Sequence, residues 1–108
     1  MPFFHVSDAS YKQKRPGVRI KSITGERAQM TFLLLDPGFV SQHSHPEEQI
    51  GYVLAGKVEI VIGEERMECG SGDGYTIPGA TPHSFRVLYE QPAGLIEIFS
   101  PPKAENKL

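Results

Sequence analysis

Two stretches of this 108-residue chain carry side chains that could bind a metal ion. The first contains His43 and His45, which face the same side if the segment is extended, because side chains alternate along a strand. Gln49 follows with a carboxamide oxygen, and a later turn-rich stretch supplies His83. Three imidazoles and one amide oxygen form a nitrogen–oxygen ligand set suited to a divalent transition metal such as Ni, Fe, Mn, Zn or Co. The alternative is that His43 and His45 are only polar residues at the mouth of a barrel.

Short extended segments must position these residues. Apolar and polar residues alternate over short runs, and turn chemistry such as Asp36-Pro37-Gly38 separates them. No stretch has a helical period longer than a turn or two, so we predict an all-β fold closed as a jelly-roll barrel, which removes exposed strand edges. The expected strands cover residues 18–23, 28–35, 49–54, 57–62, 66–69, 75–77, 83–88 and 95–99.

The length and composition predict one globular domain. Hydrophobic residues make up 39% and charged residues 22% of the chain. We expect an N-terminal arm or tail over residues 1–16, a barrel over 17–102 and a loose C-terminal tail over 103–108.

Charge and residue pattern argue against two classes of partner. The formal charge of −2 gives no basic footprint for nucleic acid. No apolar run has the length of a membrane span, and the N-terminus lacks a signal-peptide pattern. The single cysteine, Cys69, fits a reducing compartment, and we therefore expect a cytoplasmic protein.

The spacing of these residues resembles the two motifs of the cupins, a family of small β-jelly-roll (double-stranded β-helix) proteins. His43, His45, Gln49 and Gly56 match the first motif, with glutamine in place of the usual glutamate. Gly72, Pro78 and His83 match the second motif. The resemblance implies a single-domain barrel whose metal ligands are His43, His45, Gln49 and His83, and it implies a homodimer.

A narrower resemblance concerns the cupins that open the ring of 4,5-unsaturated uronates. The His-Ser-His-Pro sequence, Gln49 and the ending Leu95 to Pro101 are similar to theirs. In those proteins a carboxylate and an arginine lie around the metal. The resemblance places Glu97 and Lys103 at these two catalytic positions. A lysine offers a carboxylate substrate a point charge rather than the planar fork of arginine.

The strand pattern around Glu97 leaves its direction open. Ile96 and Ile98 flank it, so its carboxylate points to the opposite side from theirs. If that side is the barrel interior, desolvation would raise its pKa and suit it to general acid/base work. If that side is solvent, Glu97 is an ordinary exposed glutamate. Aromatic residues, Tyr75 among them, are expected to pack in the core or at the rim.

We therefore expect a metal-dependent enzyme acting on a small acidic or carbonyl-bearing molecule, by Lewis-acid and acid/base chemistry. A metal-dependent dioxygenase and a non-catalytic module that binds a small ligand are the alternatives.

Overall fold

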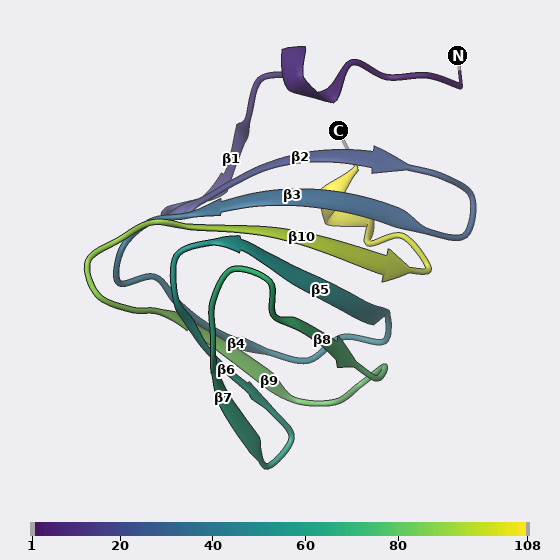
Figure 1. The fold of residues 1–108 in the computed structure, drawn as a ribbon. Coiled ribbons are helices and arrows are strands. Elements are labelled where there is room, and N and C mark those ends of the chain that lie inside the picture. Colours follow the sequence, from purple (N-terminus) through teal and green to yellow (C-terminus); the bar gives the residue numbers. More distant parts are fainter. Residues whose placement is uncertain (1, 108) are drawn as a thin grey trace.

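The fold consists of two antiparallel sheets that pack face to face (Figure 1). A computed structural model describes residues 2–107 of the chain. The larger sheet has the strand order β1-β2-β3-β10-β5-β8, and the smaller has β4-β9-β6-β7. The strands are β1 Lys12–Arg15, β2 Val18–Thr24, β3 Gln29–Leu35, β4 Val40–His43, β5 Glu48–Ala55, β6 Val58–Ile62, β7 Glu65–Cys69, β8 Gly74–Ile77, β9 His83–Val87 and β10 Ala93–Ser100. Two short 3-10 turns, η1 Val6–Asp8 and η2 Ala104–Asn106, complete the described elements.

This arrangement confirms the predicted all-β jelly roll. Alternation explains it locally: in β2, Val18 and Ile20 are buried while Arg19 between them is exposed. Within residues 2–107, no helix is long and apolar enough to cross a membrane.

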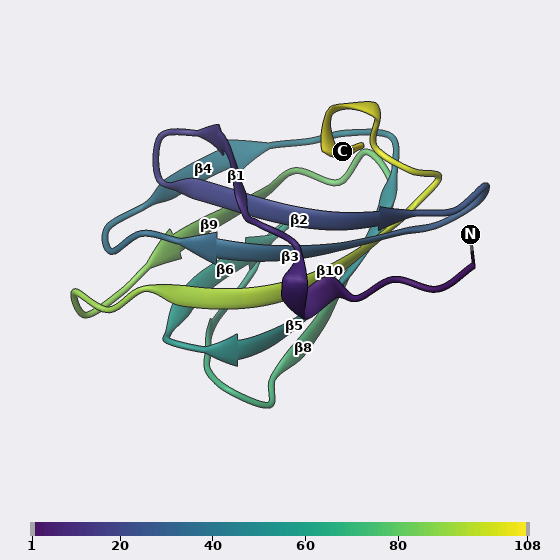
Figure 2. The ribbon, with the colours of Figure 1, turned by 90° about the horizontal axis from the view of Figure 1, so that it is seen from above.

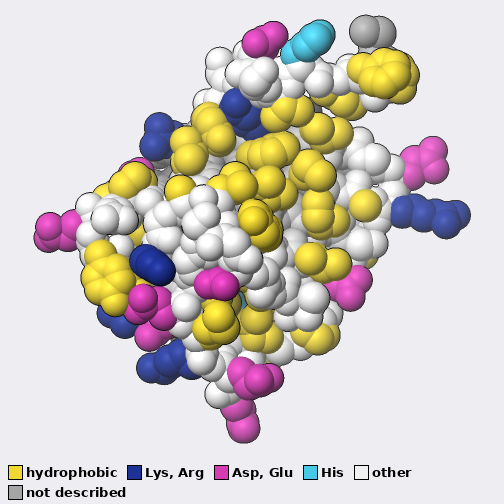
Figure 3. Space-filling view, in the orientation of Figure 1, with side chains coloured by type: hydrophobic (Ala, Val, Ile, Leu, Met, Phe, Trp, Pro, Cys, Tyr) yellow, Lys and Arg dark blue, Asp and Glu magenta, His cyan; other side chains and the backbone are white. Residues whose placement is uncertain are grey.

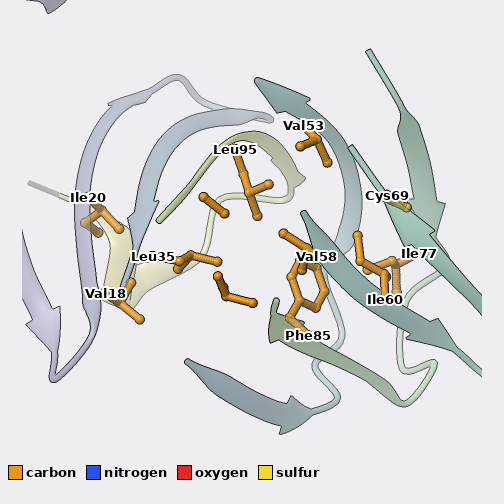
Figure 4. Close-up of a cluster of buried hydrophobic side chains, with 12 residues drawn as sticks. Val18, Ile20, Leu35, Val53, Val58, Ile60, Cys69, Ile77, Phe85 and Leu95 are labelled. Atoms are coloured by element: carbon orange, nitrogen blue, oxygen red, sulfur yellow. The ribbon is translucent and has the colours of Figure 1, made fainter. Parts of the chain in front are cut away.

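A hydrophobic core fills the space between the sheets (Figure 4). Each sheet contributes its inward-facing side chains, as the alternation requires. The turn after β5 is confined to glycine, since Gly56 has φ +82° and a Cβ there would lie 2.4 Å from the Pro92 carbonyl oxygen. The fully buried members of the core include Val53, Val58, Ile77 and Leu95.

The opposite face of the larger sheet is also apolar. Ile98 of β10 lies in register with Met30 of β3 and with Ile50 of β5. Met30, Ile50, Tyr52 and Leu54 keep between 38% and 47% of their surface exposed. We call this surface the outer apolar face; apolar side chains gather over β3, β10 and β5 in Figure 3. A contiguous apolar surface of this kind is typical of an interaction site.

Both ends of the chain differ from the sequence prediction. Residues 12–15, expected in an arm, form the edge strand β1 paired with β2. The C-terminal segment folds back beside β2 and β3 (Figures 1 and 2), and the Gln29 carboxamide exchanges hydrogen bonds of 3.1 and 3.3 Å with the backbone of Lys103. Lys103 and Asn106 are buried. The prediction of a loose tail is therefore wrong for residues 103–107. The buried side chains of this segment are polar, so it carries no apolar pattern from which burial could be predicted. Residues 1 and 108 lie outside the described part of the chain.

Candidate metal centre

Three imidazoles meet at one end of the smaller sheet. His43 ends β4 and His83 begins β9, and the two are paired across the sheet. His45 lies two residues beyond the end of β4. The ring centroids are 4.6 to 5.6 Å apart, and one nitrogen of each ring lies within 4.8 Å of the others. The topology thus joins residues 40 positions apart into one cluster.

Gln49 reaches the same cluster from the other sheet. It is a buried residue of β5, and its Oε1 lies 3.1 Å from His45 Nε2. All four residues that the sequence predicts as ligands are therefore together in the structure, three from the smaller sheet and its following loop, and one from the larger sheet.

Backbone carbonyls fix which imidazole nitrogens face the cluster. His45 Nδ1 lies 3.0 Å from the Glu47 carbonyl oxygen, and His83 Nδ1 lies 2.9 Å from that of Thr81. A ring that donates its Nδ1–H to a carbonyl keeps the Nε2 lone pair for a ligand, as metal-binding histidines do. His83 Nε2 is buried and has no hydrogen-bond partner among the described residues. An orphaned acceptor beside two other imidazoles is the observation that fits a bound metal ion.

The electrostatics keep two of the imidazoles, those of His43 and His83, in the form that binds metal. Burial, followed by repulsion from His83 and Lys103, lowers the pKa of His43 to about 4. Burial also lowers the pKa of His83 below its ordinary value. Neutral imidazole is the ligating form, so protons compete little with a metal for these rings at neutral pH. The donor set fits a divalent transition metal.

Glu97 points into the barrel, which decides the alternative that the sequence left open. Only 3% of its surface is exposed. Its Oε2 accepts a hydrogen bond of 2.6 Å from the Tyr75 hydroxyl and a second bond from Gln49 Nε2. Burial raises the pKa of Glu97, and the Tyr75 and Gln49 hydrogen bonds oppose that rise. The carboxylate is therefore buried, and Gln49 lies between it and the histidine cluster.

A pocket connects this carboxylate and the cluster to two lysines. It holds about 450 Å³, counting the part that opens to solvent, and Glu97, His43 and Gln49 line it together with Lys103 and Lys14. Its remaining walls are mostly apolar, from residues such as Phe39, Phe85, Leu95 and Phe99. The structure thus brings Lys103, the second predicted catalytic residue, into the wall of the same pocket as Glu97.

The lysines share one carboxylate. Lys103 Nζ lies 2.8 Å from Glu105 Oε1, and Lys14 Nζ lies 3.6 Å from Glu105 Oε2. Burial and the charge of Lys103 lower the pKa of Lys14 to about 8. At this side of the pocket two ammonium groups therefore share a single carboxylate.

Sequence reasoning missed Lys14 and the polar role of Tyr75. Lys14 lies in a basic run, which the sequence favours as a solvated edge or tail over an anion-binding patch. A signal for Tyr75 did exist: Gly51 interrupts the strand opposite it, and a glycine within a strand often marks a close approach by another group.

The comparisons with known proteins agree with this geometry. A family model described as "Cupin domain" matches residues 31–99. An uncharacterized protein of Streptomyces coelicolor, SCO3923, is 30% identical over 71 residues, which are 65% of this chain and 67% of that protein.

Solved structures with the same fold cover nearly the whole chain. KdgF from Halomonas sp. superimposes with a TM-score of 0.88 at 26% identity, covering 97% of each chain. An RmlC-like cupin from Shewanella frigidimarina gives 0.89 at 18% identity, covering 97% of this chain and 95% of its own, and shows the fold alone. The oxalate decarboxylase of Bacillus subtilis, a protein with Mn(II) centres, gives 0.80 at 25% identity; this chain covers only 30% of its length.

Proposed function

The chain belongs to the cupin family, and we propose that it is a metal-dependent enzyme acting on a small acidic or carbonyl-bearing molecule. We take an unsaturated uronate as the leading substrate. One observation carries the proposal: three imidazoles and an amide oxygen form one cluster, and His43 and Gln49 of that cluster line the same pocket as the buried carboxylate of Glu97. The resemblance of the sequence to uronate ring-opening cupins, and the structural similarity to KdgF from Halomonas sp., support the substrate class.

In this proposal His43, His45, Gln49 and His83 hold the metal. When bound, a divalent ion would supply Lewis-acid polarisation of a substrate carbonyl or hydroxyl oxygen. The amide oxygen of Gln49 is uncharged, so none of these ligands neutralises the ion directly.

Glu97 is the residue we assign to proton transfer. Both of its hydrogen bonds fall on Oε2, which leaves Oε1 for the substrate. Because burial raises its pKa, Glu97 is closer to the range in which a carboxyl group both gives and takes a proton near neutral pH. The apolar walls of the pocket would exclude bulk water from this step.

Lys103 is assigned to substrate binding. Its ammonium group lies in the pocket wall, 5.2 Å from the centroid of the Phe99 ring, and only 8% of the residue is exposed. An ammonium in this position attracts an anionic group and places it by charge rather than by a paired hydrogen-bond geometry.

Two measurements test the proposal. Elemental analysis of the purified protein should find a divalent transition metal. His83→Ala should remove this metal. The control variant His5→Ala, which changes an exposed histidine outside the cluster, should retain it. The metal-loaded protein should then consume a 4,5-unsaturated monouronate at the same rate with and without oxygen. The loss of the absorbance of the substrate's double bond measures this consumption. Consumption that requires oxygen would indicate the dioxygenase alternative, and binding without turnover would indicate the ligand-binding module.

A further inference from the structure

A row of residues across the larger sheet connects Tyr75 to Glu97. Glu97 of β10 is in register with Gly51 of β5, and Gly51 is in register with Tyr75 of β8. Glu97 and Tyr75 are therefore separated by a strand, yet the Tyr75 hydroxyl lies 2.6 Å from Glu97 Oε2. The tyrosine ring reaches the carboxylate by passing over Gly51.

Gly51 is the residue that makes this contact possible. A Cβ at this position would lie 2.0 Å from Cζ of Tyr75 and 2.3 Å from its hydroxyl oxygen. Any other residue would push the ring away from Glu97. Tyr75 also packs edge-on against Phe85, with ring centroids 5.6 Å apart, so the ring is supported from the core side.

The hydrogen bond from Gln49 to Glu97 decides how the Gln49 carboxamide is turned. An ionised carboxylate only accepts hydrogen bonds, so the NH₂ end of the amide faces Glu97 and its oxygen faces away. That oxygen lies 3.1 Å from His45 Nε2, on the side of the histidine cluster. Turned the other way, the amide would set two oxygens against each other and present hydrogens to a cation.

We propose that Glu97, held by Tyr75 across Gly51, is a positioning residue that fixes the Gln49 carboxamide with its oxygen toward the metal. This inference rests on the proposed metal centre. It gives Glu97 Oε2 a structural task that is separate from the proton transfer assigned to Oε1.

The arrangement also places the negative charge that balances the ion one residue away from the ion, rather than on a ligand. A glutamate ligand would place a negative charge directly on the metal. Here the neutral amide of Gln49 is the ligand, and the negative charge lies behind it on Glu97, to which the amide donates a hydrogen bond. A cation polarises the Gln49 carbonyl, which makes the amide N–H a stronger donor to Glu97. Carboxylates that orient metal-binding histidines act in the same way.

The test is the affinity of the metal-free protein for Co²⁺, measured by competition with a chelating dye, together with the visible absorption spectrum of the Co²⁺ complex. Glu97→Gln should weaken binding by about 10- to 100-fold, since outer partners of metal ligands contribute this much. Tyr75→Phe should weaken it by up to about tenfold, because one hydrogen bond to a charged group is lost. Glu64→Gln, in an exposed turn, and Tyr52→Phe, on the outer apolar face, are the matched controls and should change neither quantity.

Exchanging the side chains of positions 49 and 97 should restore the affinity for Co²⁺. In Gln49→Glu/Glu97→Gln, the new amide at position 97 can donate to the new carboxylate at position 49, so Co²⁺ affinity should return to the wild-type value or exceed it. Gln49→Glu alone sets two carboxylates against each other and should bind Co²⁺ more weakly than the exchanged pair. This comparison separates an oriented pair from a carboxylate that merely adds charge.

The outcomes are distinguishable from those of the proposed function. Wild-type affinity and spectrum in Glu97→Gln, or an exchanged pair no tighter than Glu97→Gln, would overturn the positioning role while leaving the metal centre intact. A wild-type protein that binds no Co²⁺ would overturn both. The expected series of affinities, without any turnover of uronate, would support the positioning role and overturn only the proposed reaction.

Discussion

The close approach over Gly51 predicts an unusual response to a small substitution. Alanine normally stabilises a strand relative to glycine by about 0.5–1 kcal/mol, because glycine loses more conformational freedom on folding. Gly51→Ala should instead destabilise this protein, since the added methyl group would occupy the space of the Tyr75 ring. The ring is the far end of a side chain and can move, but only by leaving Glu97.

The magnitude follows from these two opposed effects. Losing a hydrogen bond to a buried charged group costs about 1.5–3 kcal/mol. Subtracting the ordinary gain from alanine leaves a net loss of about 0.5–2.5 kcal/mol in the free energy of unfolding. With a urea dependence of about 2 kcal/mol/M, the middle of the range for a small domain, the unfolding midpoint should fall by about 0.3–1.3 M.

A double-mutant cycle isolates the cause. In a Tyr75→Ala background no ring opposes the methyl group, so Gly51→Ala should stabilise the protein by about 0.5–1 kcal/mol. The assay is urea unfolding of the four metal-free proteins at one fixed concentration, followed by circular dichroism. If Gly51→Ala is neutral or stabilising with Tyr75 present, the close approach does not constrain position 51, and the reasoning about the row from Glu97 to Tyr75 is refuted.

Three further predictions follow from the site and its surroundings. His43 should remain neutral in the metal-free protein down to about pH 4, and proton NMR of the imidazole would show this. Its pKa in the folded protein lies below the unfolded value of about 6.5, so the unfolded state binds more protons between pH 6.5 and pH 4. The free energy of unfolding should therefore fall as the pH drops through this window. Glu105→Gln should cost less than about 1 kcal/mol in urea unfolding, because the Glu105 side chain is 55% exposed and its pairs with Lys14 and Lys103 are screened by water; a larger loss would show that the carboxylate is a structural support of the C-terminal segment. We also expect a homodimer that covers the outer apolar face, so light scattering should give twice 12.0 kDa, and Tyr52→Glu should shift the mass toward the monomer while leaving Co²⁺ binding unchanged.

The sequence predicts the strands and the clustering of the three histidines well for physical reasons. Alternating burial in segments such as Val18–Thr24 leaves a direct pattern in the residue types, and the spacing of His43, His45 and His83 matches motifs of the cupins. The edge strand β1 leaves no such pattern, because none of the residues from Lys12 to Arg15 is apolar and the strand is held by its backbone pairing with β2.

The alternation of residue types along β10 does not predict the direction in which Glu97 points, for a different reason. A buried strand position is usually recognised because its neighbours are polar. Ile96 and Ile98 are apolar because they face the outer apolar face, so both sides of β10 look like interior. The burial of Lys103 could not be predicted from the sequence either, because it depends on hydrogen bonds with Gln29, 74 residues earlier in the chain.

The ligand set takes its members from both sheets, and this gives a bound ion a mechanical effect. His43 and His83 belong to the smaller sheet, whereas Gln49 belongs to the larger one. A single ion held by all three would be a crosslink between two layers that otherwise adhere through apolar packing. Opening of the sandwich at that end would then require breaking a coordination bond, so amide hydrogen exchange in β5 and β9 should slow together on loading, and the melting temperature should climb with metal concentration.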